Sequence, residues 1–330
     1  MEASARARAN IALAKYWGKA DDARNLPAVP SVSITLDPLV TETSVRFDPK
    51  LGRDAFRLGG ASAREEELAR VTALLDRVRR ESGVTAFATV ESSNRFPTAS
   101  GLASSASGFA ALATAARAAA GLAFDRDAIS RLARAASVSA ARSAFGGFVE
   151  LAAKSATPAT PATNEDPAAV PLAPPEHWDV RVVVAVTDEG RKATASSDGM
   201  RRTRETSPLY AAWVAAAPAL AAEVRAGILA RDLARVGPAM ERSTFAFHAS
   251  AMAATPPLLY MRPATLAALE RVRALRDIDG VGAWATMDAG PHVKVLCEAR
   301  DAARVEAALA AVPGVLRTLV GSPGPGVEVT

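Results

Sequence analysis

Apolar and polar residues alternate along several short stretches of the chain, and this alternation predicts strands. Residues 31–36 and 41–47 alternate in this way, and residues 84–91 have strand composition. The apolar run of residues 180–186 predicts a further strand. Residues 284–287 and 293–297 predict two strands on either side of a sharp Gly-Pro turn, and a strand is expected after residue 311.

Other stretches have helical spacing or composition. In residues 62–82 the apolar positions recur three and four residues apart, which predicts an amphipathic helix. Alanine-rich residues 105–120 favour a helix that ends at Gly121, and residues 127–136 predict another. Residues 209–236, 263–276 and 302–311 are also helical by pattern. Because helices and strands interleave without strict βαβ regularity, the α+β class is favoured over doubly wound α/β.

Composition narrows the functional class. The chain has 330 residues, of which 49% are hydrophobic and 22% charged, as in globular proteins. Its net charge of +4 comes without basic runs that interleave with aromatic residues, so it does not argue for nucleic-acid binding and fits an enzyme for anionic small molecules equally well. One cysteine, Cys297, and no apolar run of membrane-spanning length lead us to expect a cytoplasmic protein. No His, Cys or Glu spacing predicts a zinc site.

A loop rich in glycine and serine precedes the helix predicted at residue 105. It reads Pro-Thr-Ala-Ser-Gly-Leu-Ala-Ser-Ser-Ala-Ser over residues 97–107. A helix N-terminus offers free N–H groups, and small residues let an anion approach them closely, so the loop is a candidate phosphate site. It lacks the Gly-Lys-Ser/Thr of a P-loop and any Gly-x-Gly-x-x-Gly. A serine N-cap on an ordinary core helix is the alternative.

Three further groups of residues have side chains suited to anions or to catalysis. Lys15, Tyr16 and Lys19 near the N-terminus can bind phosphate, although an edge strand with a solvated basic end would look the same. Arg142 stands among small hydroxyl residues and can clamp a carboxylate or phosphate, unless it is a surface arginine. Asp288 lies between an apolar strand and a Gly-Pro turn, where it caps the turn or takes part in chemistry.

These segments together resemble a known family. Residues 97–106 resemble the phosphate loop of the GHMP kinase superfamily. Residues 10–19, 137–147, 192–200 and 286–292 resemble motifs of its mevalonate diphosphate decarboxylase branch, in this order along the chain. The chain departs from the family pattern at Val138, where glycine is usual, and at His292, where asparagine is usual.

The resemblance implies a fold and a reaction. We expect a GHMP kinase fold with a ribosomal-protein-S5-like N-terminal domain, residues 1–178, and a ferredoxin-like C-terminal domain, residues 179–330. The implied activity is the ATP-dependent decarboxylation of mevalonate 5-diphosphate to isopentenyl diphosphate, with release of ADP, phosphate and CO₂. ATP and Mg²⁺ are the implied cofactors, and a homodimer is the implied assembly.

The resemblance also implies residue roles. Asp288 is the expected catalytic carboxylate, and Arg142 is expected to hold the substrate carboxylate. The remaining expected substrate-binding residues are Tyr16, Trp17, Lys19, Ser137, Ser139, Ser196, Ser197, Gly199 and Met200. The expected ATP-binding residues are Asn94, Pro97, Ser100, Gly101, Leu102, Ala103, Ser104, Ser105, Ser107 and Lys192, with Ser105 also at the metal. For Lys192, an ordinary polar turn is the alternative.

Other functions remain compatible with these motifs. A mevalonate 5-phosphate decarboxylase or a mevalonate 3-kinase of the same branch would share most of them. A non-catalytic homologue that binds phosphate ligands is the alternative from another class, although such a protein would not need Asp288.

Overall fold

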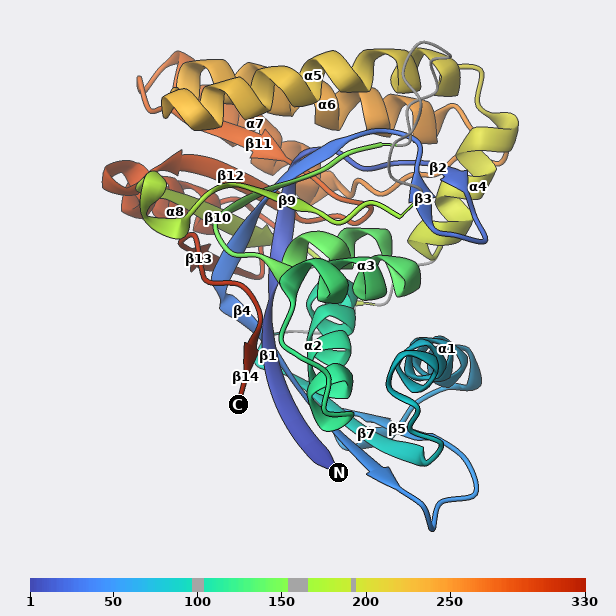
Figure 1. Cartoon of the computed structure of the whole chain (residues 1–330). Helices are drawn as coiled ribbons and strands as arrows, with labels where there is room; N and C mark the ends of the chain where they lie inside the picture. Colours follow the sequence, from blue (N-terminus) through green and yellow to red (C-terminus); the bar gives the residue numbers. More distant parts are fainter. Residues whose placement is uncertain (97–103, 154–165, 191–193) are drawn as a thin grey trace.

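The computed structural model describes residues 1–96, 104–153, 166–190 and 194–330. Figure 1 shows helices and strands mixed throughout the chain, which confirms the α+β class. The strands are β1 Glu2–Ala14, β2 Lys19–Asp21, β3 Leu26–Pro27, β4 Ser31–Asp48, β5 Ala55–Leu58, β6 Ala61–Ser62, β7 Phe87–Asn94, β8 Phe148–Leu151, β9 Val170–Ala173, β10 Val180–Val186, β11 Ala283–Thr286, β12 Val293–Glu298, β13 Arg317–Gly321 and β14 Glu328–Val329. The helices are α1 Glu65–Ser82, α2 Ser104–Ala119, α3 Arg126–Ala136, α4 Ser196–Thr206, α5 Tyr210–Ala230, α6 Leu233–Met252, α7 Pro263–Asp277 and α8 Ala302–Ala310, with 3₁₀ turns η1 Val138–Ala144, η2 Pro175–His177 and η3 Ala299–Asp301.

The first sheet is built on two long antiparallel strands, β1 and β4. The first residues of β4 also pair with β8, and its second half pairs with β7. In that second half, Thr41, Thr43, Val45 and Phe47 are buried, which is the alternation that the sequence predicts. Helix α2 packs against β1 and β4, while α1 and α3 lie beside it (Figure 1).

Strand β1 is not an edge strand. It pairs with β4 on one side, and the chain returns near its C-terminus so that β14 pairs with β1 on the other. Lys15, the residue directly after β1, has only 3% of its side chain exposed. The alternative of an edge strand with a solvated basic end is therefore wrong.

The second sheet has the strand order β11-β12-β10-β13 and is covered on both faces. Val182 and Val184 of β10 pack in a cluster with residues of β1, α5 and α6. Val183 and Ala185 pack on the opposite side with α7 and α8. Burial on both faces explains why β10 is a continuous apolar run. The cluster that includes β1 residues joins the two sheets into one core.

Helices α5 and α6 form an antiparallel pair above the second sheet (Figure 1). The single helical segment expected over residues 209–236 is wrong. The chain turns at Arg231, which has a φ of 56°, and Asp232 then caps α6 by accepting a hydrogen bond from the N–H of Arg235 at 3.0 Å. Among the described residues, α5 alone is long and apolar enough to span a membrane by length and composition, but its buried face packs on α6.

Candidate active site

The end of β1 and the turn after β11 meet beside α6. The backbone N–H of Lys15 donates to Ser243 Oγ of α6 at 2.9 Å. Thr286, the last residue of β11, donates from its hydroxyl to the carbonyl of Ala12 at 3.2 Å. These bonds fix two segments that are far apart in sequence, so Lys15 comes into contact with Asp288.

Asp288 is held by two buried ammonium groups. Lys15 Nζ lies 2.7 Å from Asp288 Oδ1, and Lys294 Nζ lies 2.7 Å from Oδ2. The two lysine side chains are 3% and 1% exposed, whereas that of Asp288 is 24% exposed. The carboxylate is therefore fixed through both oxygens and still open on one side.

The charges of this cluster set its protonation. Burial raises the pKa of Asp288, but attraction and hydrogen bonds from Lys15 and Lys294 outweigh it and hold the pKa well below its usual range. Burial lowers the pKa of Lys15 to about 8; Asp288 opposes this shift, and the positive charges of Lys294 and Arg142 add to it. Asp288 is thus an anion at every physiological pH, while Lys15 titrates slightly above neutrality.

Arg142 is a buried cation held by neutral oxygens. It lies in η1 and donates to Ser33 Oγ at 3.0 Å, Ser31 Oγ at 2.5 Å and Asn10 Oδ1 at 3.2 Å. Its exposed fraction is 2%, and burial lowers its pKa to about 10 against the attraction of Asp288. A buried guanidinium among neutral groups is stabilised when an anion binds next to it. The alternative of a surface arginine is therefore wrong.

Asn10 connects β1 to η1. Its side-chain amide donates to the carbonyl of Ser139 at 3.0 Å and to Ser143 Oγ at 2.8 Å, while its oxygen accepts from Arg142. The hydroxyls of Ser137 and Ser139 lie 3.4 Å apart at the start of η1. Asn10 thus links the guanidinium of Arg142 to the backbone of η1, and the roles of Ser137 and Ser139 toward substrate stay predictions.

The two departures from the family pattern have structural explanations. Val138 is 3% exposed and packs in the core of the first sheet. Among the described residues only Asn25 and Arg231 are non-glycine residues with positive φ, so the backbone at Val138 accepts a side chain. His292 is buried, and its Nδ1 accepts the backbone N–H of Thr187 at 3.2 Å, a bond that an asparagine oxygen can also make.

Tyr16, Trp17 and Lys19 differ in how far their polar atoms are engaged. Within the described part of the chain the buried hydroxyl of Tyr16 has no hydrogen-bond partner, and burial raises its pKa. Lys19 Nζ lies 3.9 Å from an oxygen of Asp22, and burial lowers the pKa of Lys19. Trp17 is 2% exposed, and its indole N–H donates to Thr203 Oγ1 at 3.1 Å. Trp17 thus packs inside the protein, whereas Tyr16 and Lys19 have capacity for a ligand.

The first turn of α4 carries the paired serines. Ser196 is half-buried and Ser197 is exposed, while Gly199 and Met200 are buried. Met200 belongs to an apolar cluster with Trp17. The substrate contacts of Ser196, Ser197, Gly199 and Met200 stay predictions.

Only part of the candidate phosphate loop lies within the described residues. Pro97, Ser100, Gly101, Leu102, Ala103 and Lys192 lie outside the described residues. Ser104 begins α2, and Ser105 is exposed in its first turn. Ser107 and Asn94 both hydrogen-bond Thr41 Oγ1, each at 2.6 Å. In the described part of the chain no group of three or more His, Cys, Asp or Glu residues could hold a metal ion.

Comparison with known proteins identifies the family. The model of the diphosphomevalonate decarboxylase-like N-terminal domain matches residues 7–161, and that of the mevalonate 5-diphosphate decarboxylase C-terminal domain matches residues 182–317. The diphosphomevalonate decarboxylase of Eremothecium gossypii is 36% identical over 94% of this chain and 81% of its own length. The chain belongs to the diphosphomevalonate decarboxylase family. The human diphosphomevalonate decarboxylase is 34% identical over 87% of this chain and 74% of its own length.

Solved structures of diphosphomevalonate decarboxylases match the whole chain. Mevalonate diphosphate decarboxylase from Staphylococcus aureus has a TM-score of 0.92 and 35% identity, covering 100% of this chain and 98% of its own. A complex of MDDEF with MVAPP, AMPPCP and magnesium has a TM-score of 0.91 and 38% identity, covering 100% and 99%. The expected GHMP kinase fold is confirmed. The expected domain boundary at residue 178 stays a prediction.

Lys294 binds Asp288, and the sequence did not identify it as a site residue. It stands between Val293 and Val295 in a strand whose other residues are mainly apolar. A lysine in such a strand is a signal, because a buried ammonium needs a partner. The sequence does not reveal that the partner is Asp288, since the intervening turn decides where the two side chains meet.

Proposed function

We propose that this protein decarboxylates mevalonate 5-diphosphate with ATP, forming isopentenyl diphosphate, ADP, phosphate and CO₂. The observation that carries the proposal is the fixed Asp288 carboxylate, bound by Lys15 and Lys294 at 2.7 Å each and electrostatically coupled to the buried Arg142. One anion among three buried cations leaves a net positive pocket. Such a pocket suits a substrate with a carboxylate and phosphate groups.

The reaction needs two bond-breaking steps. Asp288 orients the tertiary 3-hydroxyl and accepts its hydrogen bond while that oxygen bonds to the γ-phosphorus of ATP and the bond to ADP breaks. The hydroxyl proton then passes to an oxygen of the transferred phosphoryl group. The bond between C3 and the phosphate oxygen then breaks, and phosphate leaves. At the same time the bond between C2 and the carboxylate carbon breaks, so that CO₂ departs and the electrons of this bond form the double bond between C2 and C3. Arg142 binds the carboxylate in the geometry for this elimination. Because the pKa of Asp288 is far below its usual range, orientation of the hydroxyl is its main contribution.

The described residues fit ATP and Mg²⁺. The exposed Ser105 stands in the first turn of α2, where free N–H groups would face a bound phosphate. Mg²⁺ is usually bound by substrate phosphates and waters together with only one or two protein ligands. Bound there, Mg²⁺ would neutralise phosphate charge, with Ser105 as the candidate ligand from this chain.

We extend the proposal to the substrate's 5-diphosphate. Tyr16, Lys19, Ser196 and Ser197 offer hydroxyl and ammonium donors from two segments. Charge-assisted contacts are worth about 1.5–3 kcal/mol each, so one or two contacts to the second phosphate favour the diphosphate over the monophosphate by about tenfold to ten-thousandfold. Lys19→Ala is expected to reduce this preference more than it reduces reaction of the monophosphate.

The assembly and location are part of the same proposal. We expect a cytoplasmic homodimer of the 34.1 kDa chain, to be checked by light scattering and by cell fractionation. Cys297 is buried, and burial raises the pKa of its thiol to about 12, as suits a structural thiol in a reducing compartment.

Mass spectrometry of the products tests the proposal. Wild-type protein with mevalonate 5-diphosphate, ATP and Mg²⁺ should yield isopentenyl diphosphate, and Asp288→Asn should yield almost none. A product that retains the carboxylate and carries a new phosphate would instead identify a 3-kinase. Binding without any product would identify a non-catalytic homologue.

A further inference from the structure

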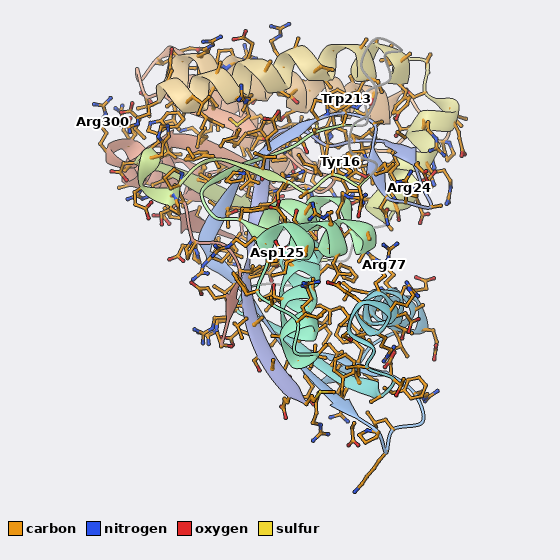
Figure 2. All side chains as sticks on the ribbon, viewed as in Figure 1. Tyr16, Arg24, Arg77, Asp125, Trp213 and Arg300 are labelled. Atoms are coloured by element: carbon orange, nitrogen blue, oxygen red, sulfur yellow. The ribbon has the colours of Figure 1, made fainter. Side chains whose placement is uncertain are left out.

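Two buried hydrogen bonds join α5, the segment of residues 15–19 and α4, and a third lies within α4. Trp213 Nε1 donates to the carbonyl of Trp17 at 2.8 Å, Trp17 Nε1 donates to Thr203 Oγ1 at 3.1 Å, and Thr203 Oγ1 donates to the carbonyl of Gly199 at 2.8 Å. Trp213, Trp17 and Thr203 are 2%, 2% and 0% exposed. In Figure 2, Trp213 lies at the α5–α6 layer, and Tyr16 lies between it and the α2–α3 layer.

The Thr203 hydroxyl is the link at which α4 meets the N-terminal segment. It donates a hydrogen bond to the carbonyl of Gly199, one turn earlier in the same helix. It accepts a hydrogen bond from the indole N–H of Trp17, which is 186 residues away in sequence. Gly199 has no side chain to keep the indole away. A Cβ there would lie only 3.0 Å from Trp17 Cη2, so the first turn of α4 packs directly on the ring.

The residues on either side of this link are the candidates for the 5-diphosphate. Tyr16 and Lys19 flank Trp17, while Ser196 and Ser197 precede Gly199. Arg204 adds a second connection, because its guanidinium donates to the carbonyl of Lys19 at 3.3 Å. Since the donors near the N-terminus and those of α4 come from distant segments of the chain, the distance between the two groups of donors depends on these tertiary contacts.

We propose that Thr203 is a positioning residue for the 5-diphosphate subsite. By holding Trp17 and Gly199 together, its hydroxyl sets the spacing between the donors of the N-terminal segment and those of α4. Thr203 itself is fully buried and acts through Trp17 and Gly199. The inference rests on the proposed function, because it assumes that these donors bind the substrate's diphosphate.

The test compares Thr203→Val with Thr203→Ser. Valine keeps the volume of threonine and leaves the Trp17 indole N–H without an acceptor, whereas serine retains the hydroxyl. Calorimetry without nucleotide should find that Thr203→Val binds mevalonate 5-diphosphate about tenfold more weakly, or about 1.4 kcal/mol. The KM for ATP should stay near the wild-type value, and the preference for diphosphate over monophosphate should fall by the same factor. Thr203→Ser should restore both quantities.

Thr206→Val is the matched control. Thr206 lies on the same helix, and its hydroxyl likewise donates to a carbonyl one turn earlier, that of Arg202, and accepts a hydrogen bond, here from the backbone N–H of Thr255 at 2.8 Å. It is exposed, and the Trp17 indole donates to Thr203 instead. This variant should keep the wild-type affinity and preference. If Thr203→Val does not fold, Trp17→Phe removes the other partner of the same bond and should cause the same selective loss.

Several results would overturn the inference. A Thr203→Val variant with wild-type affinity for the diphosphate would overturn it. Equal losses of affinity for the diphosphate, the monophosphate and ATP would also do so. A Thr203→Ser variant that restores neither the affinity nor the preference for the diphosphate would be a third such result. A Trp17→Phe variant with an unchanged preference would also contradict it. A wild-type protein that does not bind the diphosphate would overturn the proposed function together with this inference.

Discussion

Lys294→Met tests the electrostatics of the site, because it removes one of the two ammonium groups that bind Asp288. Lys294 is 1% exposed and makes its contact with Asp288 Oδ2 at 2.7 Å, while Lys15 binds Oδ1 at the same distance. Methionine keeps most of the apolar stem and loses the charge. Lys15 then keeps its attraction to Asp288 and no longer experiences repulsion from a neighbouring cation.

The expected effect is a rise in the pKa of Lys15. In the wild type this pKa is lowered to about 8, first by burial and then by Lys294, against the attraction of Asp288. Two ammonium nitrogens bound 2.7 Å from different oxygens of one carboxylate lie about 5–7 Å apart, so at an effective dielectric constant of about 20 they repel by about 2–3 kcal/mol. Removing that repulsion raises the pKa of Lys15 by about 2 units.

The pH dependence of kcat/KM for mevalonate 5-diphosphate measures this shift, because it reports groups of the free enzyme. Lys15 is charged below its pKa, so wild-type kcat/KM should fall as pH rises through about 8. In Lys294→Met the fall should begin at a higher pH, whatever the loss in maximal rate. Lys50→Met is the control: Lys50 is exposed just beyond the end of β4 that pairs with the start of β1, far from Lys15. A Lys294→Met profile that falls at the wild-type pH would refute the reasoning.

Three further substitutions test the roles of single residues. Asp288→Asn keeps the size of the side chain but loses the anion, so kcat should fall by about two to four orders of magnitude in a steady-state assay while the folded structure persists by circular dichroism. Arg142→Lys should lower kcat by about 10²–10³-fold, since one ammonium cannot bind Ser31, Ser33 and Asn10 together with a substrate carboxylate; unchanged kinetics would make Arg142 structural. Ser105→Ala should lower kcat/KM for ATP by about tenfold to a hundredfold if its hydroxyl meets a phosphate or Mg²⁺, and a wild-type value would exclude that contact.

Much of the fold could be predicted from local patterns. The strand over residues 180–186 has the bounds that the apolar run indicates, and α1 and α2 begin within a few residues of their expected starts. The break between α5 and α6 could not be predicted in this way. It depends on Arg231 in a left-handed conformation and on a cap by Asp232, without the glycine that usually marks a helix end. Pro238 inside α6 also disfavoured a long helix there, and tertiary packing overrides that local signal.

The residues of the site likewise divide into those that the local sequence indicates and those that only the folded structure brings together. Asp288 and Arg142 stand in unusual local sequence; Arg142 is buried and Asp288 half-buried, and the charge of Asp288 acts on Arg142. Asn10 and Thr203 act through partners that are distant along the chain, so no local pattern identifies them, and the apolar strand around Lys294 signals a buried lysine without revealing its partner. The buried and hydrogen-bonded state of Trp17 likewise depends on α4 and α5, which follow it by almost two hundred residues.

The most direct test of the account measures ADP and CO₂ together, with mevalonate, its 5-phosphate and its 5-diphosphate as separate substrates in the presence of ATP and Mg²⁺. We expect equal amounts of ADP and CO₂ from the 5-diphosphate, at a kcat/KM well above that for the 5-phosphate. ADP without CO₂ would contradict decarboxylation, equal efficiency on the two phosphates would contradict the diphosphate subsite, and binding without ADP release would contradict catalysis.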